Sequence, residues 1–286
     1  MKTLAFIGVG NMAGAILQGM TAENCPVRIP YENIILYDIL EEKLTPYTSL
    51  GCRHAKSIAD AVAEAEGIVL SVKPQQYGDV LGEIRRANLS LTCRTFISLA
   101  AGVDTETISN ALGGAAVVRT MPNTPLLIGE GMTALCRNEK VSDRAFEDIY
   151  AMFASRGRVV ELDESNMNRI IAVNSSAIAC FYRMIRALCQ TNGTQAELPG
   201  VDEKTLRIAA AQAALGAAKM ALEKEDIPMD ELIRMVTSYK GTTEQMMLTL
   251  DREDFDGMMT RAMLACTNRA DELGEALKDS IKNREE

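Results

Sequence analysis

The segment TLAFIGVGNMAGAI, residues 3–16, decides the fold of this chain. Its first seven residues form a short apolar run typical of a buried strand, and a helical pattern begins at Asn11. The junction between them is Gly8-Val9-Gly10-Asn11-Met12-Ala13. In such a junction Gly8 permits a tight turn, Gly10 leaves room for a pyrophosphate, and the small Ala13 lets helix and strand pack closely. Open amides at the helix start add partial positive charge, so the segment predicts dinucleotide binding.

Asp38 ends the next apolar run, NIILYD at residues 33–38, and bears on which dinucleotide is bound. A carboxylate at this place can accept hydrogen bonds from both ribose hydroxyls of NAD, and it repels the 2′-phosphate of NADP. The next residue is Ile39, so no arginine follows to offset the repulsion, although Arg53 or Lys56 could reach the phosphate. The pattern favours NADH over NADPH. Alternatively, Asp38 caps the helix expected after it, which leaves the preference open.

Short apolar runs recur through the first half of the chain, and helical patterns separate most of them. The runs lie at 3–9, 33–38, 67–72, 95–100, 115–121, 131–136 and 158–163, and the helical patterns include 11–22, 41–50, 57–65 and 143–155. Several runs are apolar at odd and even positions alike, as strands buried on both faces must be. Residues 1–163 are therefore predicted to form an α/β dinucleotide-binding domain with a doubly wound, Rossmann-type, mainly parallel sheet and right-handed crossovers.

The period of the apolar pattern changes after Asp163. Apolar residues fall at helical spacing over 166–190, 204–224, 229–236 and 244–250, and one further stripe comprises Met259, Met263, Cys266, Ala270 and Leu273. Residues 164–286 are therefore predicted to form an all-helical domain. So small a unit has more apolar surface than it can bury alone, so we expect it to pair with a second copy in a homodimer.

Composition excludes several classes of function. His54 is the only histidine, which rules out a Ser-His or Cys-His triad elsewhere in the chain and a multi-histidine metal site, so no metal is expected. A net charge of −9 and only 5% aromatic residues argue against a nucleic acid partner. No apolar run approaches the length of a membrane span. Seven scattered cysteines without CxxC spacing, and no leader peptide, predict reduced thiols in a cytoplasmic protein.

Other motifs are more specific than the glycine junction. In chain order they are Val72-Lys73-Pro74-Gln75, Ser98-Leu99-Ala100-Ala101-Gly102-Val103, Val118-Arg119-Thr120-Met121-Pro122-Asn123-Thr124-Pro125, Gly129-x-Gly131-x-Thr133, Gly216-Ala217-Ala218-Lys219-Met220 and Val236-Thr237-Ser238-x-x-Gly241-Thr242-Thr243. Together they resemble the motifs of the pyrroline-5-carboxylate reductases, which catalyse the last step of proline synthesis. The resemblance spans nearly the whole chain.

The resemblance implies an oxidoreductase that transfers a hydride from NADPH or NADH to the ring imine of 1-pyrroline-5-carboxylate, giving L-proline. The cofactor residues it implies are Gly8 to Ala13, Ser71, Val72, Lys73, Pro74, the Ala100-Ala101 turn beside the nicotinamide, and Asn123. It also implies a substrate pocket in the helical domain, completed at a dimer interface. There Ser238 and the amides of Gly241 and Thr242 hold the carboxylate, Thr243 faces the ring nitrogen, and Glu164 and Ser176 lie near the substrate. Members of the family also assemble as rings of dimers.

These residue types suit the reaction without a histidine. Hydride transfer is the cofactor's chemistry, so the protein need only place the imine beside the nicotinamide and support its charge. The Thr243 hydroxyl can orient the ring nitrogen, and the Ser238 hydroxyl with backbone amides can hold a carboxylate even in an acidic protein. The same segment predicts a helix start with Thr242 or Thr243 as N-cap, and the two interpretations agree because a helix N-terminus binds anions. Arg119 is expected to serve structure or an interface more than chemistry.

Several residues depart from the family pattern. The common Ser-Gly-Ser-Gly-Pro-Ala-Tyr segment is Asn174-Ser175-Ser176-Ala177-Ile178-Ala179-Cys180 here, Tyr239-Lys240 replaces Pro-Gly, and Ile58 replaces an asparagine on the ribose side. The lost glycines add side chains where backbone approaches a ligand or a partner helix. Two alternatives therefore stay open at this stage: a divergent relative that reduces another cyclic imine, and a non-enzymatic dinucleotide-binding regulator.

Overall fold

The computed structural model describes residues 1–23, 25–190 and 197–282. The chain divides into two compact units, and each is described by itself below. Unit 1 combines Met1–Ser175 with the chain from Ala265 to its carboxyl end, and unit 2 is Ser176–Leu264. These units are groups of residues in contact, whereas the boundary predicted after residue 163 divides the chain into two functional domains. That boundary stays a prediction.

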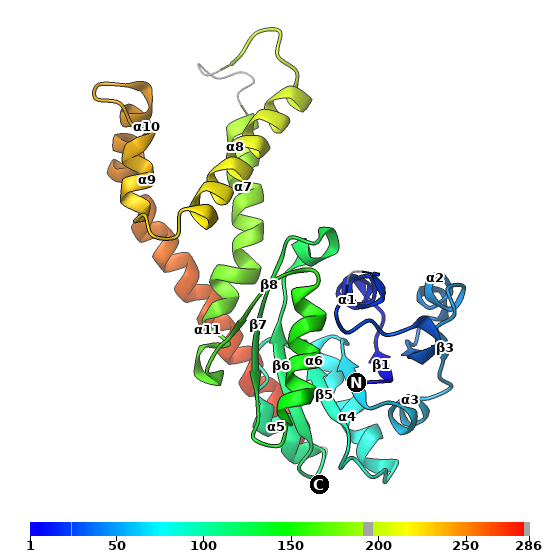
Figure 1. The fold of residues 1–286 in the computed structure, drawn as a ribbon. Helices are drawn as coiled ribbons and strands as arrows, with labels where there is room; N and C mark the ends of the chain where they lie inside the picture. Colours follow the sequence, from blue (N-terminus) through cyan, green and yellow to red (C-terminus); the bar gives the residue numbers. More distant parts are fainter. Residues whose placement is uncertain (24, 191–196, 283–286) are drawn as a thin grey trace. The chain divides into compact units, whose positions relative to one another are not determined.

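Unit 1 is built on one eight-stranded sheet with the order β3-β2-β1-β4-β5-β6-β7-β8 (Figure 1). Neighbouring strands are parallel except β6 and β7, where Met121 pairs with Ala134 in antiparallel register. The sheet therefore confirms the predicted mainly parallel architecture. The strands are β1 (Leu4–Ile7), β2 (Ile34–Tyr37), β3 (Arg53–His54), β4 (Gly67–Leu70), β5 (Thr95–Ser98), β6 (Ala116–Met121), β7 (Gly131–Arg137) and β8 (Gly157–Glu161).

Helices cover both faces of this sheet, and successive side chains of β1 therefore pack in two different cores. Leu4 and Phe6 pack in a core with α1 and α6, whereas Ala5 and Ile7 pack in a core with α3, α4, α5 and the end of α11. This alternation confirms the prediction of strands buried on two faces. The helices of unit 1 are α1 (Asn11–Thr21), α2 (Thr45–Thr48), α3 (Ile58–Glu64), α4 (Tyr77–Arg86), α5 (Thr105–Ala111), α6 (Asp143–Ala154) and the last part of α11 (Phe255–Lys282).

Two expected helices are shorter than their patterns. The helix expected over 41–50 is a 3-10 turn, Glu41–Lys43, followed by the four-residue α2, in which Pro46 supplies no amide hydrogen. The helix expected over 166–190 contains a π-turn, Ala172–Ser176, before α7 (Ala177–Cys189) begins. In both places a helical period is present, but local backbone geometry divides the helix.

Unit 2 is helical, as predicted, and carries an unusual amount of exposed apolar surface. It contains α7, α8 (Glu203–Glu223), α9 (Met229–Met235), α10 (Thr242–Arg252) and the first part of α11. Among its described residues no side chain is buried, and most exposed large apolar residues of the chain lie here. A unit without a core of its own needs another surface to cover it. Within the described ranges, no helix is both long and apolar enough to cross a membrane.

Candidate active site

The turn after β1 has the geometry of a phosphate-binding loop. Gly8 has φ of +90°, and a Cβ there would lie 3.0 Å from the backbone of Ser71 on the neighbouring β4 side. A side chain at Gly8 would therefore be strained and crowded. A Cβ at Gly10 would meet nothing within 4 Å, so this residue faces open space. Gly10 is also the N-cap of α1, and no side chain caps the amides of the first turn.

Asp38 fastens this loop to the end of β2. Its Oδ2 accepts the Val9 amide at 2.7 Å, and its Oδ1 accepts the Leu40 amide at 3.0 Å. The Lys43 ammonium lies 3.5 Å from Oδ2, while the Asp38 residue is only 9% exposed. Each carboxylate oxygen can accept more than one hydrogen bond. The carboxylate thus supports its own turn, as the capping alternative expected, and keeps acceptor capacity for a ribose.

A pocket of about 450 Å³ lies beside this loop at the carboxyl ends of β1, β2 and β4. It is lined by six of the residues predicted to bind cofactor: Gly8, Gly10, Asp38, Ser71, Val72 and Lys73. Ile58, noted for its departure from the family, lines it as well. Lys43 and Gln76 also line it, and sequence reasoning missed both, although Lys43 follows Asp38 by five positions. A crevice at this edge of a parallel sheet is where doubly wound proteins bind dinucleotides.

The other predicted cofactor residues do not line this pocket. Asn11 and Met12 lie in the first turn of α1, where Ala13 is buried, and Pro74 opens the 3-10 helix Pro74–Gln76. Ala100 and Ala101 follow β5, and the Ala100 amide donates to the Ser98 hydroxyl at 3.3 Å. The side-chain amide of Asn123 is engaged with the protein, as described below. The pocket therefore unites the phosphate and ribose residues, whereas the expected nicotinamide residues follow β5 and β6.

The turn after Ala101 packs directly on α11. A Cβ on Gly102, which has φ of +83°, would lie 2.6 Å from the Ala270 carbonyl oxygen, and a Cβ on Gly274 would lie 2.1 Å from the Gly102 carbonyl. Only glycine at both positions allows this approach. Lys278 on the same helix forms an ion pair with Asp104 at 2.9 Å. The end of α11 therefore fixes the turn that carries Ala100 and Ala101.

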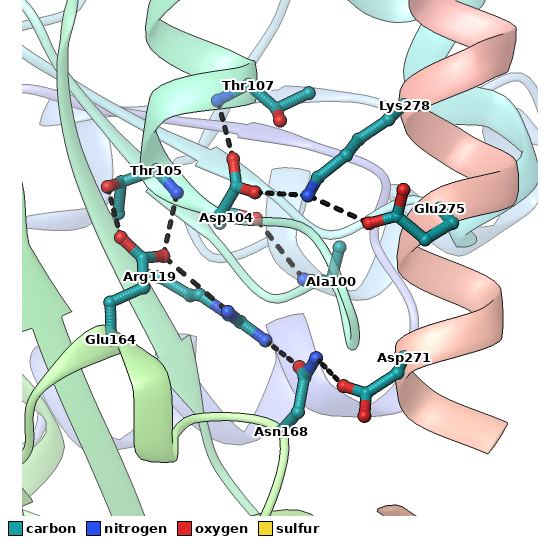
Figure 2. A network of polar contacts seen from close by, with 11 residues as sticks. Ala100, Asp104, Thr105, Thr107, Arg119, Glu164, Asn168, Asp271, Glu275 and Lys278 are labelled. Carbon is teal, nitrogen blue, oxygen red and sulfur yellow. Dashed lines mark hydrogen bonds and ion pairs between the residues drawn. The ribbon is translucent and has the colours of Figure 1, made fainter. Parts of the chain in front are cut away.

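Glu164 lies in a polar network below this turn (Figure 2). Its Oε1 accepts the Thr105 amide at 2.8 Å and its Oε2 accepts the Thr105 hydroxyl at 2.5 Å. Arg119, which is 2% exposed, places Nη1 at 3.5 Å from Glu164 and donates Nη2 to Asn168, whose amide donates to Asp271. In this conformation both oxygens of Glu164 bind the start of α5. Arg119 has the structural contacts that the sequence led us to expect.

The network changes the proton affinity of several groups. Burial by itself raises the pKa of Asp104, but hydrogen bonds from Thr107 and Lys278 outweigh it and leave that pKa below its usual value. Hydrogen bonds to Asp104 and Glu275 raise the pKa of Lys278. Burial, with a smaller contribution from Glu164, raises the pKa of the Cys136 thiol to about 12. The pair Asp104–Lys278 is therefore charged across the neutral range, and Cys136 is a neutral thiol.

Four residues predicted to hold the substrate lie at the start of α10 in unit 2: Ser238, Gly241, Thr242 and Thr243. Gly241 is the N-cap of α10, so the predicted helix start is confirmed, while Thr242 and Thr243 are its first two residues rather than its cap. The Gly241 amide donates to the Ser238 carbonyl at 2.9 Å, and a Cβ on Gly241 would lie 2.2 Å from Ser238 Oγ. Glycine thus lets the Ser238 hydroxyl lie beside a helix start that no side chain caps.

The departures from the family pattern also have defined positions. Lys240 adopts φ of +56°, a conformation that glycine adopts readily, and its amide donates to Glu244 at 2.8 Å. Tyr239 is 82% exposed, with the Lys240 ammonium 5.2 Å from its ring centroid. Ser176 is the last residue of the π-turn and the N-cap of α7. Ser238, Gly241, Thr242, Thr243 and Ser176 thus belong to unit 2, whereas the cofactor pocket and Glu164 belong to unit 1.

Comparison with known proteins adds independent information about the whole chain. The sequence model for pyrroline-5-carboxylate reductase dimerisation matches residues 164–273. The model for NADP oxidoreductase, coenzyme F420-dependent, matches residues 3–102. Pyrroline-5-carboxylate reductase of Haemophilus influenzae is 34% identical over 278 residues, covering 95% of this chain and 97% of that protein. The Methanosarcina acetivorans enzyme of the same name is 32% identical, covering 96% of this chain and 98% of that protein.

Solved structures agree with these relatives. A pyrroline-5-carboxylate reductase from Coxiella burnetii has a TM-score of 0.83 at 32% identity, covering 95% of this chain and 98% of that one. Plasmodium falciparum pyrroline carboxylate reductase with NADP bound also has a TM-score of 0.83, at 24% identity, covering 96% of this chain and 98% of that one. The second likeness is one of fold.

Proposed function

The chain belongs to the pyrroline-5-carboxylate reductase family, and we propose that it reduces the ring imine of 1-pyrroline-5-carboxylate to L-proline. Its cofactor is a nicotinamide dinucleotide, which supplies the hydride when bound. The relatives match nearly the full length of both halves of the chain, which favours this reaction over a different imine or a regulator without activity.

The residues of unit 1 fit a dinucleotide. Gly8 brings the loop backbone against β4 without a side chain, and the glycine cap at Gly10 leaves the amides of α1 open toward a pyrophosphate. The loop is held in this shape by Asp38 through the Val9 amide. We assign the predicted set to these roles, with Ser71 to Pro74 along the pocket and Ala100-Ala101 beside the nicotinamide.

The residues of unit 2 fit a small carboxylate with a ring nitrogen. Ser238 Oγ and the first-turn amides of α10 form a neutral anion site, in which Thr242 contributes its amide. The Gly241 amide serves the turn in the conformation described, so its role is to bring Ser238 close to the helix start. We assign the Thr243 hydroxyl to the ring nitrogen, where it orients the imine for hydride transfer.

Glu164 and Ser176 remain assigned to the neighbourhood of the substrate. For Glu164 this role requires that it release Thr105, whose amide and hydroxyl it now accepts.

We also propose that NADH is preferred to NADPH. Asp38 places a carboxylate at the end of β2, and this carboxylate repels a 2′-phosphate. Lys43 opposes this effect, because its ammonium lies 3.5 Å from the carboxylate and lines the same pocket. Arg53, which the sequence left as a second cation, forms an ion pair with Glu64 instead. The preference therefore depends on the balance between Asp38 and Lys43.

The chain forms a homodimer through its helical half, which matches the family's dimerisation model. We propose that residues 164–286 act as the dimerisation and substrate domain, residues 1–163 as the dinucleotide domain, and that the protein works in the cytoplasm. Its seven cysteines are free, which suits a reducing compartment. Sedimentation velocity would separate a dimer of 31.1 kDa chains from a ring of dimers, the larger assembly that the resemblance leaves open.

The observation that supports the proposed reaction most directly is the presence, in one chain, of a dinucleotide pocket and a glycine-capped helix start beside Ser238 and Thr243. The test adds pyrroline-5-carboxylate to the purified dimer with NADH or with NADPH and measures oxidation of the cofactor as the loss of reduced-nicotinamide absorbance. The amount of proline formed should equal the amount of cofactor oxidised. Tight dinucleotide binding without oxidation would instead support the regulator, and oxidation with a different cyclic imine alone would support the divergent relative.

A further inference from the structure

Two buried asparagine side chains are joined at the end of β6. Asn123 donates its side-chain amide to the Asn174 carbonyl oxygens, to Oδ1 at 3.0 Å and to the backbone oxygen at 3.2 Å. Asn174 donates in turn to the Met121 carbonyl at 2.7 Å and to the Met132 carbonyl at 3.1 Å. The Met132 amide donates to Asn123 Oδ1 at 2.9 Å. Both residues are less than one-tenth exposed.

These bonds use every side-chain N–H of the pair. An asparagine offers two N–H donors and one carbonyl acceptor, and here both donors of each residue have partners. A buried amide with all its donors satisfied is rigid, because any rotation would leave a polar group without a partner. A serine at position 174 could donate only one such bond. Holding both the Met121 and the Met132 carbonyl therefore requires the side-chain amide of Asn174.

The pair holds the loop Met121–Asn123, which lies at the cofactor edge of the sheet. β6 neighbours β5 in parallel register, so this loop and the Ala100-Ala101 turn leave the same edge. Thr120 joins the two strand ends by donating to the Ser98 carbonyl at 3.1 Å. Ser175, next to Asn174, donates to the Pro122 carbonyl at 3.3 Å. Residues 174 and 175 therefore bind the carbonyls of two successive loop residues.

We propose that Asn174 is a positioning residue, which holds the Met121–Asn123 loop in the shape required beside the nicotinamide. This inference rests on the proposed function, because it needs the nicotinamide to lie at the β5–β6 edge. Because the side chain of Asn123 is bonded to Asn174 and to the Met132 amide, a contact of Asn123 with the cofactor comes from its backbone.

The matched control is Asn138, which follows β7 and contacts the start of β6. Its Oδ1 accepts the Val117 amide at 3.1 Å and its Nδ2 donates to the Ala115 carbonyl at 3.0 Å. It therefore makes the same kind of bridge near the start of β6, away from the cofactor edge. The test compares Asn174→Ser with Asn138→Ser in the full-length dimer. Asn174→Asp is a second variant, which keeps the shape and the acceptors of Asn174 but removes its donors.

Both serine variants should lose thermal stability, but only Asn174→Ser should lose catalysis. A nicotinamide displaced by a fraction of an ångström should lower kcat about 10- to 100-fold and enlarge the isotope effect with deuterated NADH, with most of the dinucleotide affinity retained. Asn174→Asp should behave like Asn174→Ser. Equal kcat for Asn174→Ser and Asn138→Ser would overturn the proposal, as would a Kd for NADH that rises in proportion to the lost activity.

A second readout does not need the substrate. The chain has no tryptophan, so the emission of bound NADH reports the surroundings of the nicotinamide directly. This emission should change in Asn174→Ser and stay as in the wild type in Asn138→Ser. If wild-type protein binds NADH without reducing pyrroline-5-carboxylate, the proposed function fails. An emission that is unchanged in Asn174→Ser refutes the positioning role by itself.

Discussion

Asp38 and Lys43 provide the sharpest test of cofactor choice, because they carry opposite charges 3.5 Å apart in one pocket. Replacing Asp38 by asparagine removes the negative charge but keeps one acceptor for the Val9 or Leu40 amide. Replacing Lys43 by alanine removes the only lysine within bonding distance of that carboxylate among the described residues. The two variants should therefore move the ratio of NADPH to NADH affinity in opposite directions.

The size of the effect follows from the position of Asp38. Two unit charges 4 Å apart interact with about 1 kcal/mol in water and about 4 kcal/mol at the effective dielectric constant of a protein surface. The repulsion between Asp38 and a 2′-phosphate should lie between these two energies, and Lys43 offsets part of it. We therefore expect about 1–3 kcal/mol against binding of the 2′-phosphate. The wild type should thus bind NADH roughly 5- to 150-fold more tightly than NADPH. Asp38→Asn should bring the two Kd values close together, and Lys43→Ala should separate them by a further factor of about 2–5.

The assay is a fluorescence titration of both reduced cofactors at one ionic strength. Glu83→Gln is the control, because Glu83 is a carboxylate that lines the same pocket from α4 rather than from the end of β2. Its change in the ratio should be smaller than that of Asp38→Asn. Equal or tighter NADPH binding by the wild type would mean that Asp38 serves only its own turn and the Val9 amide. The Asp38 carboxylate would then not determine the choice of cofactor.

Three further predictions concern other parts of the chain. Thr243→Val should lower kcat/KM roughly 10- to 150-fold, since a hydrogen bond to a charged group contributes about 1.5–3 kcal/mol. Thr249→Val is the control and should have little effect, because the Thr249 hydroxyl donates to the Gln245 carbonyl within its own helix. Glu164→Gln should cost about 1.5–3 kcal/mol in urea unfolding because it leaves the buried Arg119 guanidinium without its carboxylate, and exposed Glu161→Gln should not. In the native protein at mildly alkaline pH, iodoacetamide should modify exposed Cys93 and spare buried Cys136, because the pKa of the Cys136 thiol is raised to about 12. Mass spectrometry measures the modification of each cysteine, and rapid modification of Cys136 would contradict the prediction.

Much of the fold was predictable because the sheet imposes a pattern on consecutive residues. Leu4 to Ile7 are apolar throughout, and the two faces of β1 enter two different cores, as that pattern requires. β3 was missed because two exposed residues, Arg53 and His54, carry no apolar pattern. The packing of Gly274 on Gly102 was equally invisible, since nothing near either glycine identifies its partner.

The candidate site could be inferred from the sequence where its residues are consecutive, and not where residues meet through the fold. Gly8, Gly10, Ser71 and Lys73 were found from motifs, and they line one pocket. The bond from the Val9 amide to Asp38 joins residues 29 positions apart and required coordinates. The sequence could show that Asn174 replaces a serine. Its contacts with two carbonyls required the π-turn, which has no clear sequence signal.

A protein with a net charge of −9 needs a way to hold the two anions proposed here, and the caps of its helices offer one. α3, α5, α6 and α8 begin at Ser57, Asp104, Ser142 and Asp202, whose side chains accept an amide of the first turn. α1 and α10 begin instead at Gly10 and Gly241, which have no side chain to occupy those amides. A capping side chain and a bound anion compete for the same N–H groups, so a glycine cap gives up some helix stability and leaves them open to a ligand. Among the helices whose caps the structure describes, the two with glycine caps are those proposed to hold the pyrophosphate and the substrate carboxylate. The proposed anion sites therefore depend on backbone amides, which an acidic sequence can supply without a basic surface.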